Sequence, residues 1–318
     1  MKTPIVIAHR GASAYVPEHT LMAKAIAHAF GADYLEQDVV SSKDGVPLVL
    51  HDVQIDTVTN VASQFPKRQR ADGRFYAIDF TVDELKQLNV SERFDPRSGQ
   101  AAYANRYPVG EGDFRIATLD EEIQFIKNIN HTTGRQAGIY PEIKRPAWHR
   151  EQGYDLAKSV IDVLGKHGYS SKDDRCYLQC FDEAEVKRLR EELGYRGLLI
   201  QLIRHGHDEE SGTDYKRLKT REGLADAAKV ADGIGPSSGD IVSWSADGNF
   251  SIGDLVKHAH DCGLDVHPWT FRADSLPKNC PSADAMLDAC FNHAKIDGLF
   301  ADQPDLAVQF LHSMTLRE

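Results

Sequence analysis

Short apolar runs rich in β-branched residues alternate along the chain with longer stretches in which apolar residues recur with helical spacing. The short runs are typical of buried strands and the longer stretches of amphipathic helices. Nine strands are expected, over residues 5–8, 33–40, 47–50, 138–143, 175–180, 198–203, 231–235, 264–269 and 298–301. Helices are expected between most of them, for example over residues 20–30, 119–130, 155–167, 183–193, 251–262 and 283–293. This alternation predicts a parallel α/β fold.

The turn after residue 40 decides how many of these strands can be parallel. Only residues 41–46 separate the second run from the third, whereas a parallel crossover needs about a dozen residues or more. The sequence Lys43-Asp44-Gly45 is typical of a hairpin turn. We therefore expect an antiparallel hairpin, which leaves eight strands for a TIM-type (β/α)8 barrel.

The connection that follows residue 52 is too long for one crossover. A βα unit needs roughly 30 residues, and the gap from residue 53 to residue 137 exceeds this by about 50. Thr81 and Glu84 have the spacing of a helix start within it. We expect a single barrel domain over residues 1–318, with a small cap subdomain inserted at residues 53–117.

Composition and charge narrow the partners of such a fold. Of the 318 residues, 41% are hydrophobic and 27% are charged, which are ordinary values for a globular protein. The formal net charge of −11 argues against nucleic acid and against an anionic membrane surface, because both attract basic patches. A small molecule is therefore the expected partner, and the sequence gives no indication of oligomeric state.

The first residues carry one lysine and then a short apolar run that ends before His9. This run is too short for the hydrophobic region of a signal peptide and for a membrane span. As written, the chain is expected to be cytoplasmic and to make no stable membrane insertion. A periplasmic location is the alternative if a signal peptide has been removed.

Two carboxylates interrupt the second strand in an unusual way. Glu36 and Asp38 are two positions apart, so they share one face of the strand and repel each other unless a cation lies between them. Glu142 lies at the end of the next parallel strand. Three carboxylates suit a hard cation, Ca²⁺ or Mg²⁺, better than zinc. The alternative is that each acid pairs with a neighbouring base such as Arg10 or Lys144.

Other strands also end in charged or polar side chains, and these ends face one rim of a barrel. His9 and His51 are able to exchange protons near neutral pH, while Arg10 and Lys144 are suited to an anion such as phosphate. Together with a cation these groups predict a phosphate ester site. Residues 204–220, which contain His205 and His207, have the composition of an exposed loop and are not expected to bind a metal.

The order of the motifs resembles the glycerophosphodiester phosphodiesterases, in their larger bacterial form. The motifs are His9-Arg10-Gly11, Pro17-Glu18-His19-Thr20, Glu36-x-Asp38, Lys43-Asp44-Gly45, His51-Asp52, Pro141-Glu142-Ile143-Lys144, Leu178-Gln179-Cys180-Phe181-Asp182 and Leu299-Phe300-Ala301-Asp302-Gln303-Pro304.

This resemblance implies a barrel that hydrolyses deacylated phospholipids to sn-glycerol 3-phosphate and an alcohol. It implies that Glu36, Asp38 and Glu142 bind one divalent ion, with Ca²⁺ expected and Mg²⁺ as the alternative. It also implies general acid and base roles for His9 and His51, and phosphate binding by Arg10 and Lys144. Gln179 and Trp269 match positions that line the pocket in the family. The role of Glu18-His19 stays open.

Two alternatives to this function are considered. A phospholipase D-like or cyclic-phosphate-forming enzyme acting on lysophospholipids would need an exposed apolar rim. In the insertion, Phe65, Phe75 and Tyr76 are interleaved with basic residues, which argues against such a rim. A non-catalytic phosphodiester-binding barrel would be expected to lack one of the histidines or metal acids, and all of them are present.

Overall fold

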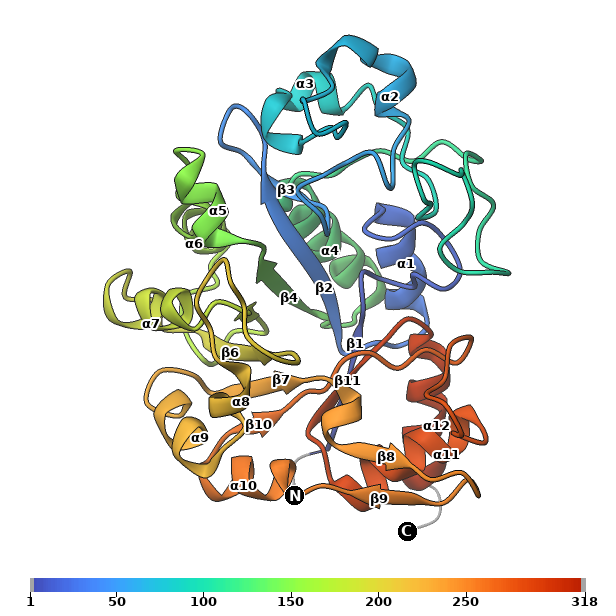
Figure 1. Ribbon diagram of the computed structural model, residues 1–318, viewed down its shortest axis with the longest axis vertical. Helices are drawn as coiled ribbons and strands as arrows, with labels where there is room; N and C mark the ends of the chain where they lie inside the picture. The colour runs from blue at the N-terminus through green and yellow to red at the C-terminus, as the bar shows by residue number, and fades with distance from the viewer. Residues whose placement is uncertain (1–2, 316–318) are drawn as a thin grey trace.

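The chain folds around a parallel sheet that curves into a barrel (Figure 1), and the computed structural model describes residues 3–315. The strands are β1 (Ile5–Ala8), β2 (Tyr34–Ser41), β3 (Pro47–Val49), β4 (Gly138–Ile143), β5 (Tyr177–Cys180), β6 (Leu198–Ile203), β7 (Gly233–Pro236), β8 (Val242–Trp244), β9 (Phe250–Ile252), β10 (Asp265–Val266) and β11 (Gly298–Ala301). The helices outside the insertion are α1 (Leu21–Ala29), α4 (Leu119–Thr133), α5 (Pro146–Glu151), α6 (Leu156–Lys166), α7 (Glu183–Glu191), α8 (Tyr215–Leu218), α9 (Arg221–Ala227), η3 (Ser238–Asp240), α10 (Leu255–Asp261), α11 (Ala283–Asp288), the π-helix η4 (Ala289–Ala294) and α12 (Pro304–Thr315).

The parallel strands follow the order β10-β7-β6-β5-β4-β2-β1-β11 in the described part of the chain. Hydrogen bonds beyond β10 close the ring: Phe300 N donates to Pro268 O at 3.0 Å, and Phe271 N donates to Phe300 O at 2.8 Å. Pro268 has no N–H to donate to β11, whereas His267 N and Trp269 N still donate to β7 on the other side. The predicted TIM-type (β/α)8 barrel is confirmed, and its strand at residues 264–269 is shorter than expected.

The hairpin predicted at residues 41–46 is also confirmed. β2 and β3 pair antiparallel, with Val39 opposite Val49, and Gly45 in the turn has a φ of +75°. Leu50 N donates to Asp38 O at 2.9 Å, which extends the pairing beyond β3. His51 is therefore brought beside the carboxylates of β2.

The inner face of the barrel changes from apolar to polar along the strands. One buried cluster comprises Ile7, Tyr34, Tyr140, Tyr177, Ile200 and Phe300. Two positions further along most of these strands stand polar side chains, namely His9, Glu36, Glu142, Gln179 and Asp302. Because side chains two apart on a strand share a face, a charged layer lies on an aromatic one.

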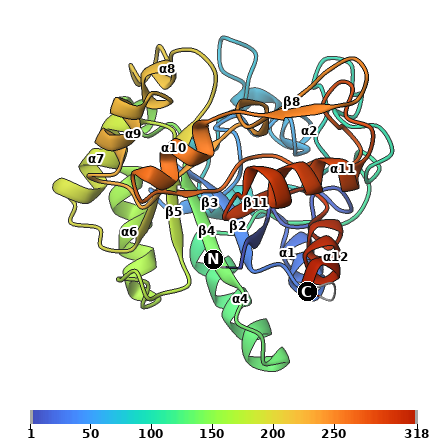
Figure 2. The same cartoon turned by 90° about the horizontal axis from the view of Figure 1, so that it is seen from below.

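Capping residues fix where the outer helices begin. The Thr20 hydroxyl accepts a hydrogen bond from Ala23 N at 3.1 Å and starts α1. Thr118 and Glu121 form a capping box at the start of α4. Figure 2 shows α1, α4, α6, α7, α11 and α12 placed around the strands, so these helices cover the outer face of the barrel.

The insertion carries α2 (Val61–Gln64), η1 (Pro66–Arg68), η2 (Ala77–Asp79) and α3 (Val82–Leu85). The predicted helix start is confirmed, because Thr81 and Glu84 form a capping box. Its buried side chains form one cluster with residues of the β2–β3 hairpin, namely Val40, Leu48, Leu50, Val53, Ile55, Val58, Val61, Phe75, Tyr76, Ala77, Ile78, Phe80, Leu85, Leu88, Val90 and Ile116. In Figure 1 these elements lie beyond the ends of β2 and β3. The division into one domain and a cap at residues 53–117 stays a prediction.

Two further segments differ from the expectation. β8 and β9 form an unpredicted hairpin in which Ser243 lies opposite Ser251, and such short strands with polar centres leave no apolar run. The helix expected at residues 251–262 therefore begins only at Leu255. Residues 204–220 were expected to be an exposed loop, which is wrong for Tyr215–Leu218, where Asp214 caps α8.

Within residues 3–315, no helix combines the length and the apolar character needed to cross a membrane. The compartment expected from the sequence stays a prediction.

A buried ion pair behind β2 ties the barrel to α1 and α4. Lys24 Nζ and Glu122 Oε1 are 2.6 Å apart with both side chains fully buried, and Nζ also donates to the Glu36 carbonyl. Lys24→Met would leave the Glu122 charge buried and unpaired, so we expect the free energy of unfolding to fall by about 3–5 kcal/mol. Urea unfolding measures this loss. The double variant Lys24→Met/Glu122→Leu is expected to recover part of it, and equal losses in both variants would contradict the argument.

Candidate active site

A cavity of about 550 Å³ opens at the carboxyl ends of the barrel strands. The residues predicted for the site all line it, namely His9, Arg10, Glu36, Asp38, His51, Glu142, Lys144, Gln179 and Trp269. They come from different strands, because the carboxyl ends of parallel strands meet at one rim. The loop at residues 204–211 forms part of the wall, while His205 itself points outward with 72% of its side chain exposed.

Three buried carboxylates meet in this cavity. Glu36, Asp38 and Glu142 each offer an oxygen, and these oxygens all lie within 4.8 Å of one another. The register explains the grouping, since Asp38 stands opposite Glu142 in the β2–β4 pair and Glu36 lies two positions earlier on the same face.

The crowding of the three carboxylates shifts their pKa values. Burial raises the pKa of Glu36 well above its usual value, and the charges of Asp38 and Glu142 raise it further. Burial also raises the pKa of Glu142 to about 8, against the opposing effect of Lys144. Burial would raise the pKa of Asp38 too, but Lys144 and the histidines His51 and His19 hold it well below its usual value. Additional positive charge is needed to keep all three carboxylates ionised near neutral pH.

The alternative of simple acid–base pairing accounts for only part of the trio. Lys144 Nζ lies 2.8 Å from Glu142 Oε1 and 3.6 Å from Asp38 Oδ1, and Arg10 Nε lies 3.5 Å from Asp38 Oδ2. Glu36 is different: over residues 3–315 its carboxylate has no ion pair with a lysine or arginine. It accepts from Arg10 N at 2.8 Å and from Gln179 Nε2 at 3.1 Å.

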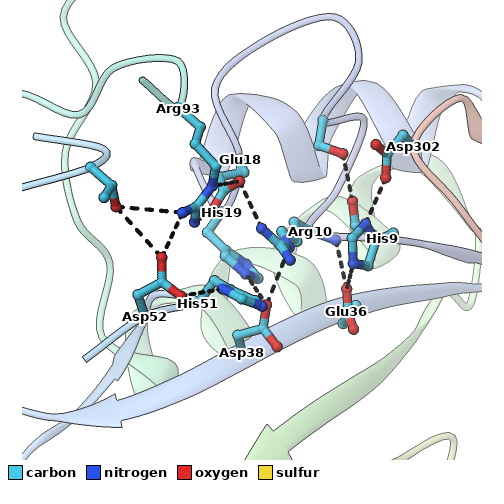
Figure 3. A network of polar contacts seen from close by, with 12 residues as sticks. His9, Arg10, Glu18, His19, Glu36, Asp38, His51, Asp52, Arg93 and Asp302 are labelled. Atoms are coloured by element: carbon cyan, nitrogen blue, oxygen red, sulfur yellow. Dashed lines mark hydrogen bonds and ion pairs between the residues drawn. The ribbon is translucent and has the colours of Figure 1, made fainter. Parts of the chain in front are cut away.

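His9 is held by a carboxylate at the end of β11. Its Nδ1 lies 2.6 Å from Asp302 Oδ1, and its Nε2 lies 3.9 Å from Glu36 Oε2 (Figure 3). An ionised carboxylate only accepts, so Nδ1 carries the proton in this bond. Burial and the charge of Arg10 lower the pKa of His9 to about 4, which favours neutral imidazole. Its Nε2 lone pair is therefore free to take a proton.

His51 has the same arrangement at the end of the hairpin. Its Nδ1 lies 2.6 Å from Asp52 Oδ1, and 28% of its side chain is exposed. Burial, with the charges of Arg10 and Lys144, lowers the pKa of His51 to about 4. The site thus contains two imidazoles, each oriented by an aspartate through Nδ1.

A tight turn after β1 places Arg10 in the site. Arg10 has a φ of +57° and Gly11 a φ of +88°. A Cβ on Gly11 would lie 2.8 Å from the Ala23 backbone, so this close approach to α1 requires glycine. The turn lets Arg10 Nη1 donate to Glu18 Oε2 at 2.9 Å while its backbone N–H reaches Glu36.

Several residues of this network were left open or not predicted. His19 Nε2 lies 2.7 Å from Asp38 Oδ2, and Glu18 binds both Arg10 and Arg93. Asp302 also accepts from Arg106 Nη2 at 2.7 Å. The position of Asp302 at the rim could have been predicted from the sequence, because the residue directly follows a strand. The positions of Arg93 and Arg106 could not have been predicted, because both residues lie in irregular parts of the insertion.

Gln179 and Trp269 complete the inner wall. Gln179 Oε1 is buried beside Glu36 and has no hydrogen-bond partner within the described chain. Trp269 Nε1 donates to Gly235 O at 2.8 Å, and its ring meets Phe181 edge-on with centroids 5.7 Å apart. The wall therefore combines one free polar oxygen with a fixed aromatic surface.

Comparisons with known proteins show relatives that match nearly the whole chain. The chain is 41% identical to a glycerophosphodiester phosphodiesterase of Haemophilus influenzae, over 96% of this chain and 89% of that protein. Among solved structures, a putative glycerophosphoryl diester phosphodiesterase from Silicibacter pomeroyi is similar in fold, with a TM-score of 0.72, 21% identity, and coverage of 99% of this chain and 95% of that chain. An Oleispira antarctica phosphodiesterase, solved in complex with the product sn-glycerol-3-phosphate, has a TM-score of 0.66, 19% identity, and coverage of 98% of this chain and 97% of that chain. A family model described as "Glycerophosphoryl diester phosphodiesterase family" matches residues 9–306. The chain therefore belongs to the glycerophosphoryl diester phosphodiesterase family.

Proposed function

We propose that the protein hydrolyses glycerophosphodiesters to sn-glycerol 3-phosphate and an alcohol with the help of one divalent cation. Family membership supports the reaction, and the similar Oleispira antarctica enzyme was solved with that product. One observation carries the proposal: three buried carboxylates, two cationic side chains and two oriented imidazoles lie in the same cavity. This set matches the needs of phosphate ester cleavage.

The donor atoms fit a hard cation. Glu36, Asp38 and Glu142 would hold it, and the unpaired Gln179 Oε1 is a further oxygen nearby. Oxygen ligands favour Ca²⁺ or Mg²⁺, and the wide, adaptable coordination of Ca²⁺ makes it the expected ion, with Mg²⁺ as the alternative. When bound, the cation would offset the negative charge of the phosphodiester and polarise its phosphoryl oxygen.

The chain's own side chains supply the remaining steps. Arg10 and Lys144 bind phosphate oxygens and stabilise the charge that develops on them. One of His9 and His51 accepts a proton at Nε2 from the attacking oxygen. The other donates a proton from Nε2 to the oxygen of the leaving alcohol, for which it must be in the imidazolium form, a form that the bound phosphodiester anion favours. Proton transfer of this kind contributes roughly 10² to 10⁴ in rate.

The lysophospholipid alternative lacks support in the insertion. Phe75 and Tyr76 are buried in the cluster shared with the hairpin, and Phe65 packs against it. These aromatic side chains therefore do not form an apolar rim for membrane contact. The partner expected for the cavity remains a small glycerophosphodiester.

A substrate panel tests the proposed reaction. Glycerophosphocholine, glycerophosphoethanolamine and lysophosphatidylcholine are incubated with the enzyme and Ca²⁺, and glycerol 3-phosphate is followed through its dehydrogenase. Release of choline is followed separately for lysophosphatidylcholine, because its cleavage leaves an acylated glycerol phosphate. We expect release of glycerol 3-phosphate from the two glycerophosphodiesters, with kcat/KM at least about a hundredfold above turnover of the lysolipid, since the aromatic side chains Phe65, Phe75 and Tyr76 form no apolar rim for an acyl chain. Preferential cleavage of lysophosphatidylcholine, or a persistent cyclic phosphate product, would contradict the proposal.

A further inference from the structure

The aspartates that orient the two histidines are themselves held by arginines of the insertion. Asp52 binds Arg93, and Asp302 binds Arg106. Both arginines lie within residues 53–117, although one contacts Asp52 near the start of the chain and the other contacts Asp302 near its end. Neither is among the described residues that line the cavity, so neither is placed to bind the substrate.

Arg93 makes a double clamp. Its Nη1 donates to Asp52 Oδ2 at 2.5 Å, and its Nη2 and Nε donate to the two oxygens of Glu18 at 2.6 and 3.1 Å. Figure 3 shows its guanidinium between Glu18 and Asp52. Since Asp52 holds His51 through its other oxygen, the carboxylate is fixed from both sides.

Arg106 makes a similar clamp on the other histidine. Its Nη2 donates to Asp302 Oδ2 at 2.7 Å, while its Nε donates to Asp274 Oδ2 at 2.8 Å. The guanidinium lies 3.8 Å from the centroid of the Tyr103 ring, and only 4% of the side chain is exposed. Arg272 Nε also donates to Asp302 Oδ2 at 2.8 Å, so this carboxylate has two cationic supports.

We propose that Arg93 and Arg106 are positioning residues, through which the insertion holds both imidazoles in the orientation needed for proton transfer. The proposal rests on the proposed function only in taking His9 and His51 as the proton carriers. An aspartate that can rotate would no longer fix the ring or its Nδ1–H tautomer. Each arginine opposes that rotation, because it donates one hydrogen bond to the aspartate oxygen that the histidine leaves free. The fork of each guanidinium is itself fixed on a second carboxylate, Glu18 for Arg93 and Asp274 for Arg106.

The competing explanation is that these arginines only dock the insertion onto the barrel. In that case their loss would lower stability but leave the chemistry of correctly folded enzyme unchanged. The two explanations differ in kcat, in chemical rescue and in the state of the imidazoles.

The test compares Arg93→Ala and Arg106→Ala with Arg97→Ala, an exposed arginine of the same insertion. We expect kcat for glycerophosphocholine to fall about tenfold to a hundredfold in the first two variants, with KM nearly unchanged. Because both guanidinium groups are largely buried in ion pairs, their unfolding temperatures should also fall, so kcat is compared at a temperature at which every variant is folded. Arg97→Ala is expected to match the wild type. Arg106→Ala is expected to lose less than Arg93→Ala, because Arg272 still supports Asp302.

Chemical rescue and a conservative variant distinguish loss of the guanidinium group from loss of folding. Added guanidinium at concentrations well below those that unfold the protein should restore kcat in both alanine variants and not change Arg97→Ala. Arg93→Lys and Arg106→Lys keep the charge but lose the fork, so they are expected to fold and to remain below wild type in kcat. Folded variants with wild-type kcat, or a rise in KM alone, would overturn the proposal.

Imidazole NMR separates this proposal from the proposed reaction. In ¹H–¹⁵N spectra, assigned with His9→Ala and His51→Ala, both rings should show protonated Nδ1 in the wild type. The Nδ1–H signal of His51 should weaken or shift only in Arg93→Ala, and that of His9 only in Arg106→Ala. Unchanged signals would refute positioning even in an active enzyme. Failure of the wild type to cleave glycerophosphodiesters would refute the reaction while the NMR result still decided the positioning.

Discussion

Replacing His9 or His51 by alanine is expected to lower kcat for glycerophosphocholine by about 10² to 10⁴. Each imidazole has Nδ1 committed to an aspartate and Nε2 available in the cavity, so its loss removes one proton-transfer group. KM should change little, because Arg10 and Lys144 remain to bind the phosphate. Steady-state rates from the coupled glycerol 3-phosphate assay measure both constants.

The double variant provides a sharper test of this assignment. If both histidines serve one reaction, removing the second should cost much less than removing the first, since residues that act as a unit are not additive. His205→Ala is the matched control, because that ring is 72% exposed. Circular dichroism should show the same fold in all variants. Near wild-type turnover by either single variant would exclude the histidine as a catalytic residue.

Removal of the proposed divalent cation is expected to lower activity by a factor of at least about 10³. The three buried carboxylates repel one another and the anionic substrate, and the pKa values of Glu36 and Glu142 are already raised by this crowding. Dialysis against EDTA should remove activity, and Ca²⁺ should restore it better than Mg²⁺. Mass spectrometry of the untreated protein should find about one equivalent of metal per chain.

A matched pair of substitutions locates the ion. Glu142→Gln should raise the Ca²⁺ concentration needed for half-maximal activity at least about tenfold, because it removes one of three charged ligands. Glu209→Gln, in the exposed loop at residues 204–211, should leave that concentration unchanged. Full activity in excess chelator, with no metal detected, would rule out a metal requirement.

The parts of the fold that could be predicted are those with strong local signals. β1, β4, β6 and β11 have the predicted bounds, because each is an apolar run closed by polar residues. The hairpin followed from the short Lys43-Asp44-Gly45 turn. The β8–β9 hairpin was missed because its strands are short and partly exposed, with Ser243 and Ser251 at their centres.

The site could be predicted as far as strand geometry alone defines it. Side chains two positions apart on a strand share a face, and the carboxyl ends of parallel strands share one rim of the barrel. These two rules were enough to group Glu36, Asp38 and Glu142 and to place His9 and His51 in the same cavity. Arg93 and Arg106 could not be found in this way. Their positions depend on how an irregular segment packs onto the barrel, and no sequence periodicity reports that packing.

The apolar cluster shared by the insertion and the hairpin also makes the two segments depend on each other. Val40, Leu48 and Leu50 belong to the hairpin, yet their buried neighbours include Phe80 and Leu85 of the insertion. A chain that lost the insertion would expose these three side chains to water, and one that gained it without them would have nothing to pack against. Deletion of the insertion is therefore expected to be tolerated only if the apolar side chains on this face of the hairpin are replaced by polar ones at the same time.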